Sequence, residues 1–113
     1  MILQILKIIA AVATVGTGVV SLLKPSTVTS FTGIRAEGPR GVTEVRAIFG
    51  GLLIAMGAFP LIAGAAVTYR MLGALYLTIA VVRAVSMVVD RSIERSNWIS
   101  LAAEVALGTV LIL

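Results

Sequence analysis

One arginine stands alone in the middle of a long apolar stretch. Between Arg70 and Asp90 the only charged residue is Arg83, and its two flanks, 77–82 and 84–89, are almost entirely apolar. A helix of this length can cross a hydrocarbon core of about 30 Å. A lone charge inside such a helix costs about 2.5–3.5 kcal/mol on insertion scales, so it usually has a partner or a function. The stretch therefore predicts a membrane helix that carries one polar site.

The composition of the whole chain agrees with a membrane setting. Its 113 residues are 59% hydrophobic and 12% charged, with a mean hydropathy of +1.12. Soluble domains carry about a quarter charged residues, and a chain of this size cannot hide so many apolar side chains in one core. We expect a single membrane domain over residues 1–113. The alternative is an apolar helical subunit of a soluble complex.

Missing residue types narrow the chemistry. The chain has no Cys and no His, which excludes disulfides, thiol nucleophiles, thiolate metal sites and imidazole acid–base catalysis. Its five carboxylates form no recognisable loop for a hard metal ion. We therefore expect no metal, no cofactor and no enzymatic activity. The net charge of +4 comes from basic residues that are thinly spread beside the apolar segments, so we expect no nucleic-acid partner.

Four apolar segments predict four membrane-spanning helices, at about residues 2–23, 43–64, 68–89 and 97–113. The predicted fold class is all-α: a four-helix transmembrane bundle with up-down-up-down order and antiparallel neighbours. Thr43 and Asn97 are the expected N-caps of the second and fourth helices. Residues 26–42 are the only long connection, and a plain surface loop is favoured there over an ordered lid.

The basic residues also predict the orientation in the cell membrane. Four spans place both termini on the same side. The two polar loops carry most of the positive charge, so the positive-inside rule places these loops in the cytoplasm and both termini outside. The loop charges are Lys24, Arg35, Arg40, Arg91 and Arg95.

Spacing predicts a partner for Arg83. It lies about seven residues before the end of the third span, and Glu104 lies about seven residues after the start of the fourth, so both are about 10 Å inside the same membrane face. The second span begins at the same membrane face, so its first charges, Glu44 and Arg46, lie in the same half of the bundle. The candidate ligand-binding residues are Arg46, Arg83, Glu104, Glu44 and Asp90.

Helical periodicity sorts these residues by face. One stripe of the fourth span contains Glu104, Gly108 and Leu111, and the stripe with Arg83 on the third span also contains Tyr76. Arg46 is expected to point inward and Glu44 sideways. Small residues permit close approach of membrane helices. The expected packing positions are Gly50, Gly51, Gly57, Gly16 and Gly108.

Several short motifs resemble a known family. Glu44-x-Arg46-Ala47-x-x-Gly50-Gly51, Arg83-x-x-Ser86 and the acidic Glu104 are similar to positions in DUF4345, small bacterial four-helix membrane proteins catalogued as a domain of unknown function. The resemblance implies an integral membrane protein of this fold and assigns no activity. A more distant likeness to four-helix proteins of quinone or thiol redox systems is weakened by the lack of Cys.

The favoured function is a non-enzymatic integral membrane protein whose polar half-site, near the cytoplasmic interface, binds a small anionic or amphipathic ligand or a lipid. In the alternative, the paired charges only hold helices together, and the chain is an accessory or structural subunit. The expected partners are membrane lipid and either a membrane protein or a second copy of the chain. A proton or ion pathway is favoured less than either, because four small helices leave no room for a pore unless the protein oligomerises.

Overall fold

The computed structural model describes all residues 1–113, and the chain is helical without any strand. All-α structure was predicted and is confirmed. One helix of 26 residues, Gly38–Ala63, is divided by a π-helical segment into three labelled parts. The elements are α1 (Ile2–Leu23), α2 (Pro25–Thr32), α3 (Gly38–Val45), η1 (Arg46–Leu52), α4 (Leu53–Ala63), α5 (Ala66–Val89) and α6 (Arg95–Ile112).

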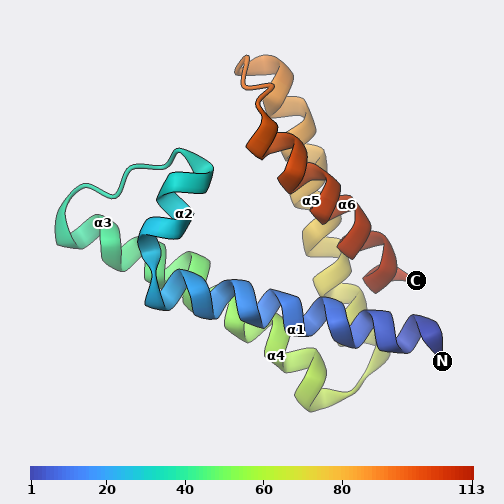
Figure 1. Cartoon of the computed structure of the whole chain (residues 1–113). Helices are drawn as coiled ribbons and strands as arrows, with labels where there is room; N and C mark the ends of the chain where they lie inside the picture. Colours follow the sequence, from blue (N-terminus) through green and yellow to red (C-terminus); the bar gives the residue numbers. More distant parts are fainter.

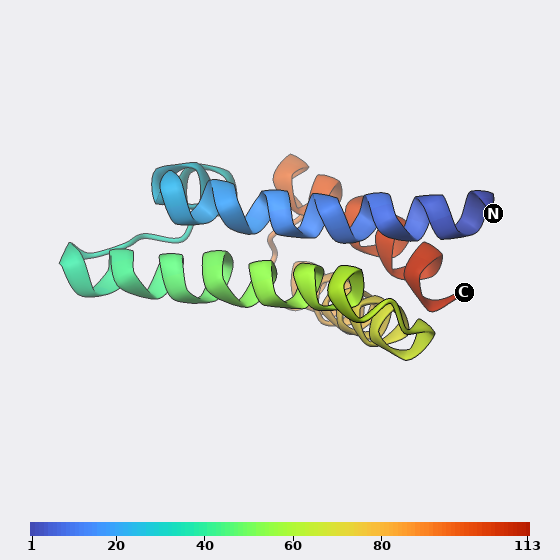
Figure 2. The ribbon, with the colours of Figure 1, turned by 90° about the horizontal axis from the view of Figure 1, so that it is seen from below.

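The helices form two antiparallel hairpins. The first hairpin pairs α1 with the continuous helix α3–η1–α4, which lie side by side in Figure 2. The second hairpin pairs α5 with α6. Figure 1 shows the two hairpins splayed apart from a shared crossing, with α2 on the side of the opening. The two helices within each hairpin are therefore antiparallel, but the four long helices do not align as the predicted up-down-up-down bundle.

A small apolar core occupies the crossing of the two hairpins. Its buried residues come from α1, α5 and α6: Ala10, Ala11, Tyr69, Leu72 and Leu111. The two alanines let the other helices approach the backbone of α1 closely. Both termini lie at this end of the molecule (Figure 1). The core thus fixes one end of each hairpin and leaves the two loop ends apart.

The segment predicted as a loop, residues 26–42, is mostly helical, and that prediction was wrong. Pro25 occupies the first turn of α2, where its missing N–H is not needed, so it starts a helix after it ends α1. Gly33 ends α2 with φ of 79°, a left-handed conformation that favours glycine. Pro39 in the first turn of α3 starts the next helix well before Thr43, which is therefore not an N-cap.

The surface is that of a membrane protein. Three helices are long and apolar enough to cross a membrane: α1, Gly38–Ala63 and α5. Large apolar side chains line the outer face of α5, and Val81, Val85 and Val88 are 59–70% exposed. A soluble monomer rarely exposes such a continuous apolar face, whereas lipid covers it at no cost. The fourth long helix, α6, has 18 residues and contains Glu104; it is not among the three.

Candidate functional site

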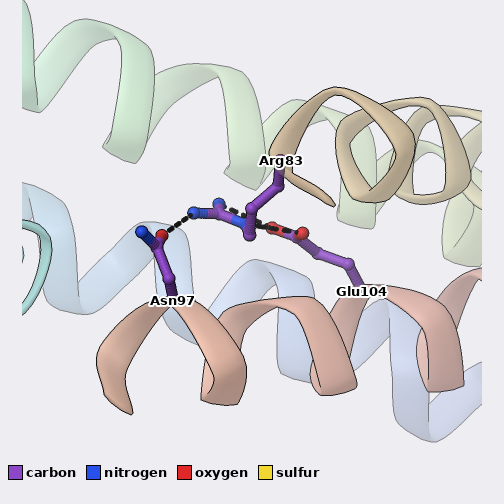
Figure 3. A network of polar contacts seen from close by, with 3 residues as sticks. All are labelled: Arg83, Asn97 and Glu104. Carbon is purple, nitrogen blue, oxygen red and sulfur yellow. Dashed lines mark hydrogen bonds and ion pairs between the residues drawn. The ribbon is translucent and has the colours of Figure 1, made fainter. Parts of the chain in front are cut away.

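The two charges inside the second hairpin meet in an ion pair (Figure 3). The Arg83 guanidinium on α5 donates from Nε to both carboxylate oxygens of Glu104 on α6, at 2.8 and 3.1 Å, and from Nη2 to Oε2 at 2.7 Å. This fork-shaped contact is the strong geometry for an arginine and a carboxylate. The predicted partner of Arg83 is therefore confirmed.

Asn97 extends the pair into a network. Its Oδ1 accepts a hydrogen bond from Arg83 Nη1 at 2.9 Å, and its Nδ2 donates to the Ser92 carbonyl at 2.8 Å (Figure 3). The predicted capping role was wrong, because α6 begins at Arg95 and Asn97 lies in its first turn without a capping bond. Asn97 instead joins Arg83 to the short loop between the two helices. Only the folded hairpin shows that Asn97 lies close to Arg83, and no pattern in the sequence indicates this contact.

The network leaves part of Arg83 free. The side chain of Glu104 is 11% exposed and that of Arg83 30%. A guanidinium has five N–H donors, and one hydrogen on each of Nη1 and Nη2 has no acceptor within the protein. The charge is thus neutralised, while two hydrogen-bond donors remain available at a fixed position.

Arg83 lines a groove of about 430 Å³ on the surface of the second hairpin. Arg83 lines it together with apolar residues from the same helix, Ile79 and Val82. Asp90 lies at its loop end, and its carboxylate forms no ion pair or hydrogen bond. The groove therefore combines an apolar wall, two donors and one free carboxylate. Its polar lining also includes Thr78, Ser86, Ser92 and Asn97.

Two further candidate residues lie on the other hairpin. Glu44 forms an exposed ion pair with Arg40, one helical turn away on α3. Arg46 is exposed, and its Nε donates to the Leu22 carbonyl at 3.1 Å. That carbonyl belongs to the last turn of α1, where intrahelical donors are lacking, so Arg46 ties down a helix end. The structure gives neither residue a polar contact with Arg83 or Glu104.

Arg46 lies at the end of the helix that faces α1. Its Nε bonds to the Leu22 carbonyl, and a Cβ on Gly50, one turn further along, would meet the same Leu22. The Arg46 side chain is nevertheless exposed, and the neighbouring buried residue is Val45. Arg46 was expected to point toward the centre of a bundle and to join the polar half-site. It instead contacts the end of α1 and takes no part in the network of Arg83 and Glu104.

A family model for the "Domain of unknown function (DUF4345)" matches residues 2–113. The chain belongs to this family. The resemblance expected from the motifs around Arg46, Arg83 and Glu104 is thereby confirmed. Comparison with curated proteins and with solved structures finds no match. Membership in DUF4345 thus covers nearly the whole chain and assigns no reaction or ligand to the groove beside Arg83.

Glycines of this DUF4345 chain divide into packed and open positions. A Cβ on Gly57 would lie 2.7 Å from the Ala11 carbonyl oxygen, and one on Gly108 would lie 2.7 Å from Leu77. A Cβ on Gly50 would meet Leu22 at 3.2 Å. Gly16 and Gly51, also expected to be packing positions, have nothing within 4 Å of an added Cβ. The chain itself uses the first three for close contact and leaves the other two facing outward.

Two further glycines make close contacts. Gly18 meets the backbone of Gly50, and Gly73 meets the backbone of Ile112. The sequence does not specify which residues of the neighbouring helix lie opposite each glycine. These contacts are known only from the way the helices pair in the fold.

A hydrogen bond joins the two hairpins. Thr14 on α1 lies 2.6 Å from the Tyr76 hydroxyl on α5, and the same Thr14 hydroxyl donates to the Ala10 carbonyl. Tyr76 shares the helix stripe of Arg83, as predicted, but its contact with α1 was not foreseen. This bond lies between the apolar core and the open ends of the hairpins, at the point where they diverge.

Proposed function

We propose that the chain is a non-enzymatic integral membrane protein that crosses the membrane four times and binds a small amphipathic molecule in the groove beside Arg83. The observation that carries the binding proposal is the pair of free N–H donors on a guanidinium that Glu104 and Asn97 hold in place. A binding site benefits from donors that are ordered before the ligand arrives. An apolar wall next to them suits a molecule with both a polar and an apolar part.

The charges in the groove specify the polar part further. Glu104 already neutralises Arg83, and Asp90 adds a free carboxylate at the loop end. A headgroup with several negative charges would meet this carboxylate and gain little from a neutralised arginine. A headgroup with one or two oxygen acceptors fits better, with its apolar part against Ile79 and Val82.

The proposed fourth crossing is α6. Its 18 residues extend about 27 Å at 1.5 Å per residue, close to the thickness of the hydrocarbon core. Its one internal charge, Glu104, is paired with Arg83, which lowers the cost of placing it in lipid. With four crossings, the loops that contain Glu37 and Ile93 lie in the cytoplasm and Leu113 lies outside.

Cysteine accessibility tests this topology, because the chain contains no Cys of its own. Single variants Glu37→Cys, Ile93→Cys and Leu113→Cys replace exposed residues. A membrane-impermeant thiol reagent should label Leu113→Cys in intact cells, and the other two only after permeabilisation. Labelling of Ile93→Cys and Leu113→Cys under the same condition would mean that α6 does not cross.

Native mass spectrometry of protein purified in mild detergent tests the binding. We expect a bound non-protein mass on the wild type, which is lost in Ser86→Phe, because this variant fills the groove without removing any hydrogen bond of Arg83. Val85→Phe is the matched control, since Val85 is on the same helix outside the groove and is 59% exposed. An identical bound mass in all three proteins, or none in the wild type, would contradict the proposal.

A second candidate is an accessory subunit, favoured by the outward face of α3, η1 and α4. This face carries three exposed small residues, Ala47, Gly51 and Ala55, and an added Cβ on Gly51 would have nothing within 4 Å. Such small residues allow a partner helix to approach closely. Gly51→Leu should then dissociate a complex that survives in mild detergent, whereas Ser86→Phe should leave it intact. Purification of the wild type as a bare monomer would contradict this candidate.

A further inference from the structure

The first hairpin has a trough of its own, away from the groove beside Arg83. An apolar groove of about 510 Å³ runs between α1, α2 and η1. Its walls include Val20, Phe31 and Phe49, and Gly16 faces it with nothing within 4 Å of an added Cβ. None of these residues lines the groove beside Arg83. The groove is open at Gly16 because glycine has no side chain to fill it.

A second hollow, of about 530 Å³, lies next to the first, and Phe49 lines both. The second hollow is lined by Ile34 and Ile48, by Arg35, and by the ion pair of Arg40 and Glu44. We refer to the two adjoining hollows as the trough.

The open end of the trough is positively charged. Residues 24–46 contain four basic and two acidic residues. Arg35 is exposed and has no ion pair or side-chain hydrogen bond, so its whole guanidinium is available. Arg40 is paired with Glu44, but its side chain is still 80% exposed. Lys24 marks the end of the apolar sequence of α1, so these charges lie at the level where lipid headgroups begin.

We propose that this trough binds one anionic phospholipid, with the phosphate at Arg35 and one acyl chain running past Phe49 toward Gly16. The charge of the open end complements the phosphate, and arginine forks match phosphate oxygens. The apolar part of the trough suits a hydrocarbon chain. The site lies on the other hairpin from the groove beside Arg83 and does not depend on ligand binding there.

Native mass spectrometry of the full chain in mild detergent, with added phosphatidylglycerol or phosphatidylcholine of the same acyl chains, tests the proposal. The wild type should retain phosphatidylglycerol in preference to phosphatidylcholine. Arg35→Gln, an exposed position without a partner, should weaken phosphatidylglycerol binding about fivefold. Arg91→Gln, in the loop of the other hairpin, is the charge control and should bind as the wild type does.

A second pair of variants tests the acyl-chain part. Gly16→Leu and Gly51→Leu both place a side chain where nothing lies within 4 Å, so neither disturbs the packing of the chain. Only Gly16 lines the trough. Gly16→Leu should abolish lipid retention, and Gly51→Leu should preserve it.

Three results would overturn the proposal. The first is equal retention of the two lipids by the wild type, and the second is equal retention by Gly16→Leu and Gly51→Leu. The third is that Ser86→Phe loses phosphatidylglycerol while Arg35→Gln retains it, which would place the lipid in the groove beside Arg83. Loss of the ligand in Ser86→Phe together with intact phosphatidylglycerol binding would keep the two sites separate.

Discussion

The two hairpins are held together in different ways. In the first, α1 meets η1 and α4 through Gly18, Gly50 and Gly57, whose missing side chains let backbone atoms touch. The second also has close glycine contacts, of Gly73 with Ile112 and of Gly108 with Leu77, but its α5 and α6 are joined in addition by the ion pair and Asn97. Close packing tolerates no added volume, whereas the polar network does not tolerate the loss of one partner. Both hairpins thus depend on shape, and only the second also depends on charge pairing.

The largest effect should come from Gly57→Leu in the first hairpin. Backbone atoms of Ala11 and Val15 lie within 3 Å of the new Cβ and cannot rotate away as side chains do. We expect a loss of about 3 kcal/mol or more in the free energy of unfolding, at the upper end for overpacking. Thermal unfolding in a detergent that keeps the chain monomeric measures it. Gly51→Leu should lie within about 0.5 kcal/mol of the wild type, and equal losses in both variants would refute the assignment of Gly57 to a tight contact.

The ion pair of the second hairpin should be sensitive to the loss of one partner. Arg83→Gln and Glu104→Gln each leave one charge without its partner, at an expected cost of about 1–3 kcal/mol. The double variant removes both charges and should recover most of that loss. Thermal unfolding of the four proteins gives the coupling energy directly. Additive losses in the double variant would mean that the two side chains do not act as a pair.

Asn97→Ala should have a smaller and more local effect. It removes the hydrogen bonds to Arg83 and to the Ser92 carbonyl, and we expect a loss of about 1 kcal/mol. Amide hydrogen exchange should rise in residues 90–94 and stay constant in α2. A uniform rise across both hairpins would instead indicate that Asn97 supports the whole fold.

The smallest effect is expected where the two hairpins meet. Tyr76→Phe removes the bond to Thr14, at a cost of about 0.5 kcal/mol, because Thr14 keeps its bond to the Ala10 carbonyl. Tyr69→Phe is the control, because its hydroxyl has no hydrogen-bond partner in the protein although the ring is buried. Spin-label distances between residues 37 and 93 should broaden in Tyr76→Phe alone. Equal broadening in both variants would exclude a specific role for this bond.

Much of the helical framework could be predicted from the sequence, because long apolar runs and single-face stripes follow from helix geometry. The stripe of Glu104, Gly108 and Leu111 is the buried face of α6, and the depth estimate that paired Glu104 with Arg83 needed only the rise per residue.

Other features depend on contacts that no local pattern encodes. Arg46 bonds to the Leu22 carbonyl at the end of α1, and the proline that ends α1 also starts α2. The wide crossing of the hairpins depends on which small residues meet, and Thr14 gives no sign in sequence that Tyr76 lies beside it. These are the reasons why Glu44 and Arg46 were grouped with Arg83 although the structure separates them.

The sequence separation of Arg83 and Glu104 bears on how the chain is made. The two residues are 21 positions apart, so Arg83 leaves the ribosome first and its partner follows only after the loop and half of α6. A chain inserted helix by helix would pass through a stage in which α5 lies in lipid with an unpaired guanidinium. Insertion of α5 and α6 together, as one preformed hairpin, avoids that stage. With the proposed crossing of α6, the ion pair thus favours a biosynthetic order in which the last two helices enter the membrane as a unit.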